Sequence, residues 1–265
     1  RARFAHVSSE AQRARLELAV TRVFLTYAAD VQTGFLTPAN VDSGIVRTVP
    51  LRDPRATLDA FAAANPAAFI ASLPPQTPEY AALQRARLEL VAAQSKGGWG
   101  PLIKAEKLEP GATGDAVVAL RDRLTRQGYL APMVTAEYDP QIADAVKRFQ
   151  ADNGLTADGV AGASTITEIN HEPVDRLKSV LVAMERLRWM NGLPLGSRHI
   201  WVNLPDFTAK VVDDGKVTFE TATVVGMNQP DRRSPEFSDQ MEFMVVNPKW
   251  NVPRSITVKE YLPML

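Results

Sequence analysis

Residues 108–170 limit the possible folds of this chain most strongly, because they contain the start and stop signals of three short helices. Thr113 or Asp115 is placed to cap the free amides of the first helix, and Gly128 ends it. Between these signals, apolar residues recur at helical spacing: Val117, Val118, Leu120 and Leu124. We therefore expect a short helix with one apolar face before Gly128.

The second helix of this segment begins at Asp139 and Pro140, where a cap residue precedes a proline whose φ suits the first helical turn. Its apolar face carries Ile142, Ala145, Val146 and Phe149. A tight turn at residues 158–159 follows, and Ser164 or Thr165 then caps a third helix. Three short helices that share one apolar face predict a compact bundle.

Residues 1–107 carry repeated helix-start signals. Ser9 and Gln12 form a capping box. After it, apolar residues recur at spacings of three and four: Leu16, Val20, Val23, Tyr27 and Val31. Three further cap residues each precede a proline, at Asp53-Pro54, Asn65-Pro66 and Thr77-Pro78. These signals predict an all-helical domain, with Phe61 and Phe69 among its buried residues.

From residue 171 the pattern changes from helix to strand. One more amphipathic helix, closed at residues 191–192, is expected to pack its apolar stripe on the strands that follow it. β-branched and aromatic runs predict strands over residues 200–204, 207–212, 217–225 and 241–246, with a hairpin turn at 213–216. Four strands need more partners than residues 171–265 supply. We therefore expect a multidomain α + β protein whose third domain is incomplete.

Composition excludes several classes of protein. Thirty basic residues balance thirty acidic ones, so nothing indicates a nucleic-acid partner. There is no cysteine, and His6, His171 and His199 lack ligand spacing, so we expect no metal and no cofactor within these residues. No apolar run is long enough to span a membrane, and an export signal would lie upstream of Arg1.

The sequence contains no self-contained active site. It has no Gly-x-Ser-x-Gly elbow, no phosphate-binding loop and no dinucleotide fingerprint. Asp213 and Asp214 are adjacent in a hairpin turn, whereas glycoside hydrolysis needs two carboxyl groups that face each other across a bond. An amidase or a glycosidase is therefore disfavoured.

The motifs of residues 108–170 follow a known order. They are Leu-x-x-Gly, Val-x-x-Leu-Arg-x-x-Leu, Gly-Tyr-Leu, Ala-Val-x-x-Phe-Gln and Asp-Gly-x-x-Gly-x-x-Thr. This order resembles the peptidoglycan-binding domain of bacterial cell-wall enzymes, and the resemblance implies binding to murein. Arg121, Tyr138 and Gln150 are the candidates to meet glycan or peptide, and the favoured alternative for each is a solvated surface residue.

A second resemblance starts at residue 202. The phrase Asn-Pro-x-Trp-x-Val-Pro-x-Ser-Ile at residues 247–256, with Arg-Ser-Pro-Glu-Phe at 233–237, looks like the opening of an L,D-transpeptidase catalytic domain of the YkuD type. The order of parts is similar to the large periplasmic L,D-transpeptidases of Gram-negative bacteria. The resemblance implies a helical scaffold at 1–107, a peptidoglycan-binding domain at 108–170 and the N-terminal part of the catalytic domain at 171–265.

The resemblance also implies a chemistry. Enzymes of this family crosslink the third residues of peptidoglycan stem peptides through a cysteine thiolate and an acyl-enzyme, a role that needs a nearby histidine and backbone amides for the oxyanion. No residue here matches that nucleophile, so no catalytic residue is assigned and the cysteine is expected downstream of Leu265. The alternative is a truncated fragment or a non-catalytic murein-binding scaffold protein.

Two residues are candidates for substrate binding. Arg233 and Trp250 can border the substrate cleft, and their alternative roles are an ion pair and an apolar plug. The expected partner is peptidoglycan, both stem peptide and glycan, and the expected location is the periplasm, with peripheral association to the cell envelope. A role in cell-wall organisation and cell shape follows from the resemblance.

Overall fold

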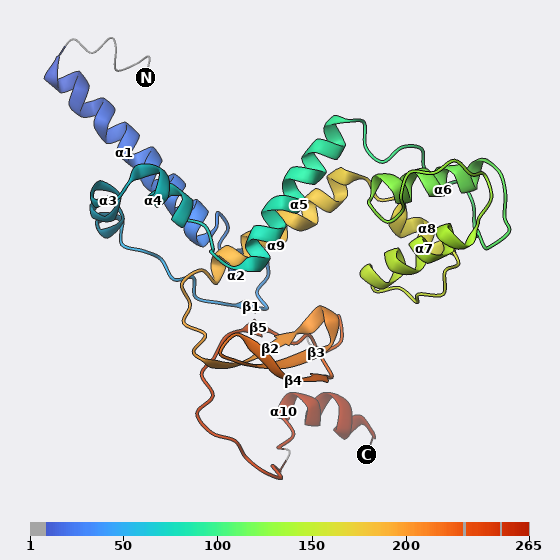
Figure 1. Ribbon diagram of the computed structural model, residues 1–265. Helices are drawn as coiled ribbons and strands as arrows, with labels where there is room; N and C mark the ends of the chain where they lie inside the picture. Colours follow the sequence, from blue (N-terminus) through green and yellow to red (C-terminus); the bar gives the residue numbers. More distant parts are fainter. Residues whose placement is uncertain (1–8, 230–231, 250, 265) are drawn as a thin grey trace.

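The computed structural model describes residues 9–229, 232–249 and 251–264. These residues form a helical part, a three-helix bundle and a part that contains most of the strands, so the fold is multidomain α + β as predicted. Figure 1 shows α5 (Pro78–Ser95) and α9 (Pro173–Trp189) side by side. The bundle lies beyond one end of this pair, and the strands lie near the other end.

The helical part begins where the capping signals predict. Ser9 accepts a hydrogen bond from the Gln12 amide, and Asp53, Asn65 and Thr77 cap later helices in the same way. Four helices precede α5, namely α1 (Glu10–Thr33), α2 (Pro38–Val41), α3 (Pro54–Ala63) and α4 (Pro66–Ser72). The cap predictions are confirmed. A cap is a contact between residues two or three positions apart, so the local sequence is sufficient to predict it.

Most of the apolar stripe of α1 is exposed. Val20, Val23 and Tyr27 are exposed, and only the last turns of the helix, around Ala28 and Gln32, are buried. The contact to the rest of the helical part runs through aromatic rings, with centroids of Phe24 and Phe61 4.5 Å apart and those of Phe61 and Phe69 5.5 Å apart. Phe61 and Phe69 pack against each other but are only partly buried, so the prediction that they are buried is met only in part.

Helix α9 packs mainly on α5 and α1. The Glu185 carboxylate accepts hydrogen bonds from the Leu36 amide at 2.7 Å and from the Trp189 indole at 3.2 Å. Arg188 donates to the Tyr80 hydroxyl of α5 at 2.9 Å. The prediction that this helix packs on the strands after it is wrong, because its polar and aromatic side chains find their partners earlier in the chain.

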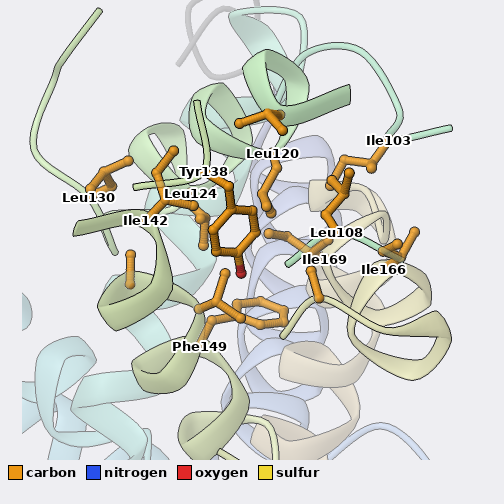
Figure 2. Close-up of a cluster of buried hydrophobic side chains, with 14 residues drawn as sticks. Ile103, Leu108, Leu120, Leu124, Leu130, Tyr138, Ile142, Phe149, Ile166 and Ile169 are labelled. Atoms are coloured by element: carbon orange, nitrogen blue, oxygen red, sulfur yellow. The ribbon is translucent and has the colours of Figure 1, made fainter. Parts of the chain in front are cut away.

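The three-helix bundle consists of α6 (Asp115–Arg126), α7 (Pro140–Asp152) and α8 (Ala163–Ile169). Its core is apolar and nearly inaccessible to water, and includes Val117, Leu120, Leu124, Tyr138, Ile142, Val146, Phe149, Ile166 and Ile169. Figure 2 shows Leu120, Tyr138 and Phe149 among the side chains of this cluster. Asp139 caps α7 as predicted. Gly114 and Gly162 occupy the other two cap positions without a side-chain cap, so the predictions for Thr113, Asp115, Ser164 and Thr165 are wrong.

Three strands form an antiparallel sheet in the order β2 (Arg198–Asn203), β3 (Thr208–Asp213) and β4 (Lys216–Ala222). Asp214 and Gly215 both have positive φ, which matches the right-handed twist of a two-residue hairpin. A second, two-stranded sheet pairs β1 (Ile45–Val46) with β5 (Glu236–Phe237) in parallel. Residues 241–246 form no strand, so that prediction is wrong.

The remaining elements are short. A single 3-10 turn, η2 (Leu204–Asp206), joins β2 to β3. Near residue 264 the chain forms α10 (Arg254–Ile256), the π-helical turn η3 (Thr257–Tyr261) and the 3-10 turn η4 (Leu262–Met264).

The buried Tyr138 hydroxyl makes the bundle sensitive to alkali. It donates to the Gly159 carbonyl at 2.8 Å, and burial raises the pKa of Tyr138 above its ordinary value of 10.0. The folded state therefore binds the proton more tightly, and the free energy of unfolding falls as the pH rises above about 10. We expect Tyr138→Phe to lower the free energy of unfolding by about 1–2 kcal/mol at pH 7.

The Tyr138→Phe variant should also lose less stability than the parent between about pH 10 and pH 12, because one ionisable hydroxyl is gone. Hydrogen exchange of the α6 and α7 amides measures both effects. Equal pH dependence in the two proteins would contradict the assignment to Tyr138.

Candidate functional site

Two of the three residues predicted to meet glycan or peptide are buried. The exposed fraction of the side chain is 1% for Tyr138 and 2% for Gln150. The Gln150 side-chain amide donates to Asp158 and to Thr165, and its oxygen accepts from the Gly159 amide. Both residues hold the loop before α8 in place, and the prediction that they face a ligand is wrong.

The third residue, Arg121, lies on α6 and makes its contacts inside the bundle. Its guanidinium donates to the Asp122 carboxylate at 2.6 Å and contacts the Thr135 carbonyl. The side chain is largely buried. Arg121 therefore braces the loop between α6 and α7, and it is poorly placed to bind a large ligand.

The described surface of the bundle contains an open hollow next to α8. Its lining includes Ala163, Ile166, Glu106 and Lys107, and its volume is about 620 Å³. A lining that combines apolar side chains with charges of both signs suits an amphipathic ligand such as a sugar bearing a short peptide. Sequence reasoning missed this hollow because residues 105–107 read only as a connection.

Asp158, in the loop before α8, is ionised at neutral pH. Asp158 accepts hydrogen bonds from the Val160 amide and from Gln150, which hold the pKa of that carboxyl below its usual value of 3.8. Its charge supports the turn before α8.

The first candidate for substrate binding, Arg233, lies in a contact between the helical part and the region after β4. Its Nη1 atom lies 2.9 Å from Oδ2 of Asp42. The Gly44 amide and then Arg233 lower the pKa of the Asp42 carboxyl. The structure thus shows the ion pair that the sequence left as an alternative, and contact of Arg233 with a substrate stays a prediction. Trp250 lies outside the described residues.

Glu236 of β5 joins three elements. Its carboxylate lies 3.2 Å from Nη2 of Arg47, which follows β1, and also contacts Arg186 of α9. The Arg47 side chain is 6% exposed, and its Nη1 atom donates to Ser238. No pattern in the sequence indicates this junction, because Arg47 is 189 residues away from Glu236.

The histidines of the described residues do not gather around a metal. His171 lies 3.5 Å from Glu168, and the buried Nδ1 atom of His199 has no hydrogen-bond partner. Among the residues that the structure describes, no three of His, Cys, Asp and Glu come close enough together to hold an ion.

Comparison with known proteins accounts for all three parts. Residues 1–86 match the family model "Scaffold domain", residues 113–169 match "Putative peptidoglycan binding domain", and residues 197–265 match "L,D-transpeptidase catalytic domain". A curated protein of Haemophilus influenzae Rd, "Putative L,D-transpeptidase", is 33% identical over 66 residues. The chain therefore combines part of an L,D-transpeptidase catalytic domain with a scaffold domain and a peptidoglycan-binding domain. The aligned residues cover 25% of this chain and only 13% of that relative.

A solved structure is similar in sequence to part of the chain. It is a periplasmic domain of the EpsAB fusion protein of the Vibrio vulnificus type II secretion system, which is 26% identical, with a TM-score of 0.26, over 29% of this chain and 37% of the other.

The matched domains bear on partner and location. The match to a peptidoglycan-binding domain supports peptidoglycan as a partner, and together with the match to the catalytic domain it implies a periplasmic or cell-envelope location. Among the helices that the structure describes, none combines the length and the apolarity needed to cross a membrane.

The Glu236 junction can be tested by removing its charge. Glu236→Gln keeps the shape but leaves the nearly buried Arg47 without a counter-charge. We expect the free energy of local opening around residues 44–47 and 234–238 to fall by about 2 kcal/mol, measured by hydrogen exchange.

The matched control for Glu236→Gln is Glu220→Gln, whose carboxylate pairs with Lys210 on the exposed surface of the sheet at 3.3 Å. Loss of that exposed pair should change protection little. If both variants lower the protection of residues 44–47 and 234–238 to the same extent, Glu236 does not join these segments.

Proposed function

We propose that this protein is a peptidoglycan L,D-transpeptidase that joins the third residues of stem peptides through a cysteine acyl-enzyme. The observation that supports this proposal most directly is the match of residues 197–265 to the catalytic-domain model, in one chain with a peptidoglycan-binding domain. Residues 1–265 contain no cysteine. The proposal therefore includes a nucleophilic cysteine outside these residues.

The proposed reaction has two steps. A cysteine thiolate attacks the carbonyl carbon of the third residue of a donor tetrapeptide, so a thioester forms while the amide bond to D-alanine breaks and its nitrogen takes a proton. An amine of an acceptor stem then attacks the thioester, a new amide forms and the thiolate is released. A histidine that raises the thiolate fraction and backbone amides at the oxyanion lower the barriers.

The domains divide this work. We assign residues 1–107 to the scaffold, 108–170 to murein binding and 171–265 to the catalytic portion, with α9 packing on the scaffold. Arg233 and Trp250 stay candidates for the border of the substrate cleft. The location that fits this division is the periplasm of a Gram-negative bacterium, with peripheral attachment to the cell wall.

A second function follows from one specific observation. The murein-binding bundle has a complete core, whereas the 265 residues contain no thiol. A non-catalytic murein-binding scaffold protein would have the same features. The two functions differ in whether the gene encodes a cysteine beyond residue 265.

The decisive experiment is to sequence the complete gene and to substitute the cysteine that it encodes. We expect a cysteine after a Ser-His-Gly phrase, and Cys→Ala at that position should abolish crosslinks between third residues in a murein digest. A gene product that contains no cysteine would rule out the transpeptidase and leave the scaffold function.

Murein binding can be tested in the described chain. Ala163→Arg places a long side chain over the hollow beside α8, and Ala151→Arg adds the same charge to the exposed face of α7 as a control. If murein occupies the hollow, Ala163→Arg should weaken retention of the 265-residue chain on purified sacculi about tenfold, or 1.4 kcal/mol. Equal retention of both variants would exclude the hollow.

A further inference from the structure

Arg123 on α6 is the largest side chain in the described core with no exposed surface. A guanidinium cannot lose its charge in a protein, so its burial requires that its five N–H groups find acceptors. Here it donates to four backbone carbonyls and to one carboxylate, that of Glu172 at 3.1 Å. The charge is thus paired, and the donors are occupied.

The acceptors of Arg123 lie on the two segments that connect the bundle to the rest of the chain. Gly100 and Pro101 belong to the incoming segment after α5, and their carbonyls accept at 2.9 and 3.4 Å. Ile169 and His171 belong to the outgoing segment before α9, and their carbonyls accept at 2.9 and 3.1 Å. One side chain therefore ties α6 to both connections at once. We call residues 97–103 and 169–173 the neck.

The neck is closely packed. Asn170 donates to the Ile103 carbonyl and accepts from the Ile103 amide, which joins the two connections directly. A Cβ atom added at Gly98 would lie 2.7 Å from the Glu172 carboxylate, and one added at Gly100 would lie 3.0 Å from Arg126. Both glycines have positive φ. Solvated linkers between mobile domains lack such close contacts.

A second arginine supports the same arrangement from α9. Arg176 lies 2.8 Å from the Glu168 carboxylate of α8 and donates to Asn153, at the end of α7, at 3.0 Å. The other end of α9 is held by the scaffold through Glu185 and contacts the catalytic segment through Arg186. Helix α9 therefore spans the distance between the bundle and the catalytic segment.

We propose that Arg123 is a positioning residue that fixes the orientation of the peptidoglycan-binding domain on α5 and α9. Because Arg123 fixes this orientation, the domain holds bound murein at a constant distance from the catalytic segment. The proposal depends on geometry within this chain and goes beyond the function proposed above. Lysine cannot replace Arg123, because one ammonium cannot reach carbonyls on both connections and the Glu172 carboxylate together.

The test measures the distance between domains. Because residues 1–265 contain no cysteine, Glu89→Cys on α5 and Gln141→Cys on α7 place two spin labels at exposed positions with no background labelling. Pulsed electron paramagnetic resonance then gives the distribution of label distances in the 265-residue chain. Arg123→Lys, Arg123→Met and Glu172→Gln are compared with the parent at a temperature where circular dichroism shows each to be folded.

We expect the distribution to widen roughly twofold in both Arg123 variants and less in Glu172→Gln, where the carbonyl contacts remain. The matched control is Arg121→Met, on the same helix, whose contacts stay inside the bundle. It should keep the width of the parent. Should Arg123→Met fail to fold, Arg123→Lys and Glu172→Gln decide the question.

An unchanged width in the folded Arg123→Lys and Glu172→Gln variants would overturn the proposal, even if their melting temperatures fall, because a purely structural role moves only the melting temperature. Equal widening in Arg121→Met would overturn it too. The distance measurement needs no murein, so its outcome is independent of whether the hollow beside α8 binds murein.

Discussion

The packing of α9 against α5 and α1 is the contact on which the rest of the molecule depends. A largely buried carboxylate, Glu185, is acceptable at this interface only because the Leu36 amide, the Trp189 indole and Arg188 supply donors. Gly34 leaves the space for it, since a Cβ atom there would lie 2.6 Å from the carboxylate oxygen. These groups come from both sides of the peptidoglycan-binding domain, so the scaffold is completed by residues that follow that domain in sequence.

This arrangement makes the peptidoglycan-binding domain an insertion between two packed helices. An insertion with a closed neck is held at two points, so its freedom to rotate is smaller than that of a domain on a single linker. Helix α9, which completes the scaffold, precedes the sheet in sequence. Further along the chain, β5 pairs with β1, and Glu236 of β5 contacts Arg47. Helix α9 thereby connects the peptidoglycan-binding domain, the scaffold and the catalytic segment.

The sequence predicted features that depend on neighbouring residues. The caps at Asp139 and Asp53 and the hairpin at residues 214–215 involve positions two or three apart, and all of them are confirmed. The bundle core was predicted from helical periodicity. In each case the hydrogen bonds or the apolar face lie within one element, so the local sequence is sufficient.

Features that depend on distant residues could not be predicted. Nothing near Glu185 or Glu236 in sequence indicates that their partners lie about 150 and 190 residues away. Tyr138 and Gln150 appeared available for a ligand because polar atoms are usually exposed, but here both satisfy buried backbone groups. Residues 241–246 have the composition of a strand, yet a strand also needs a neighbour, and composition does not supply one.

The central claim is that α9 completes the scaffold, and one comparison of folding stability tests it most directly. In the first protein, residues 102–170 are replaced by a short Gly/Ser linker, which is feasible because the retained residues Gly98 and Glu172 lie close together. The second protein is residues 1–101 alone. Thermal unfolding and hydrogen exchange of the α5 amides should show a cooperative, protected scaffold in the first protein and little protection in the second. Equal stability of the two would contradict the claim.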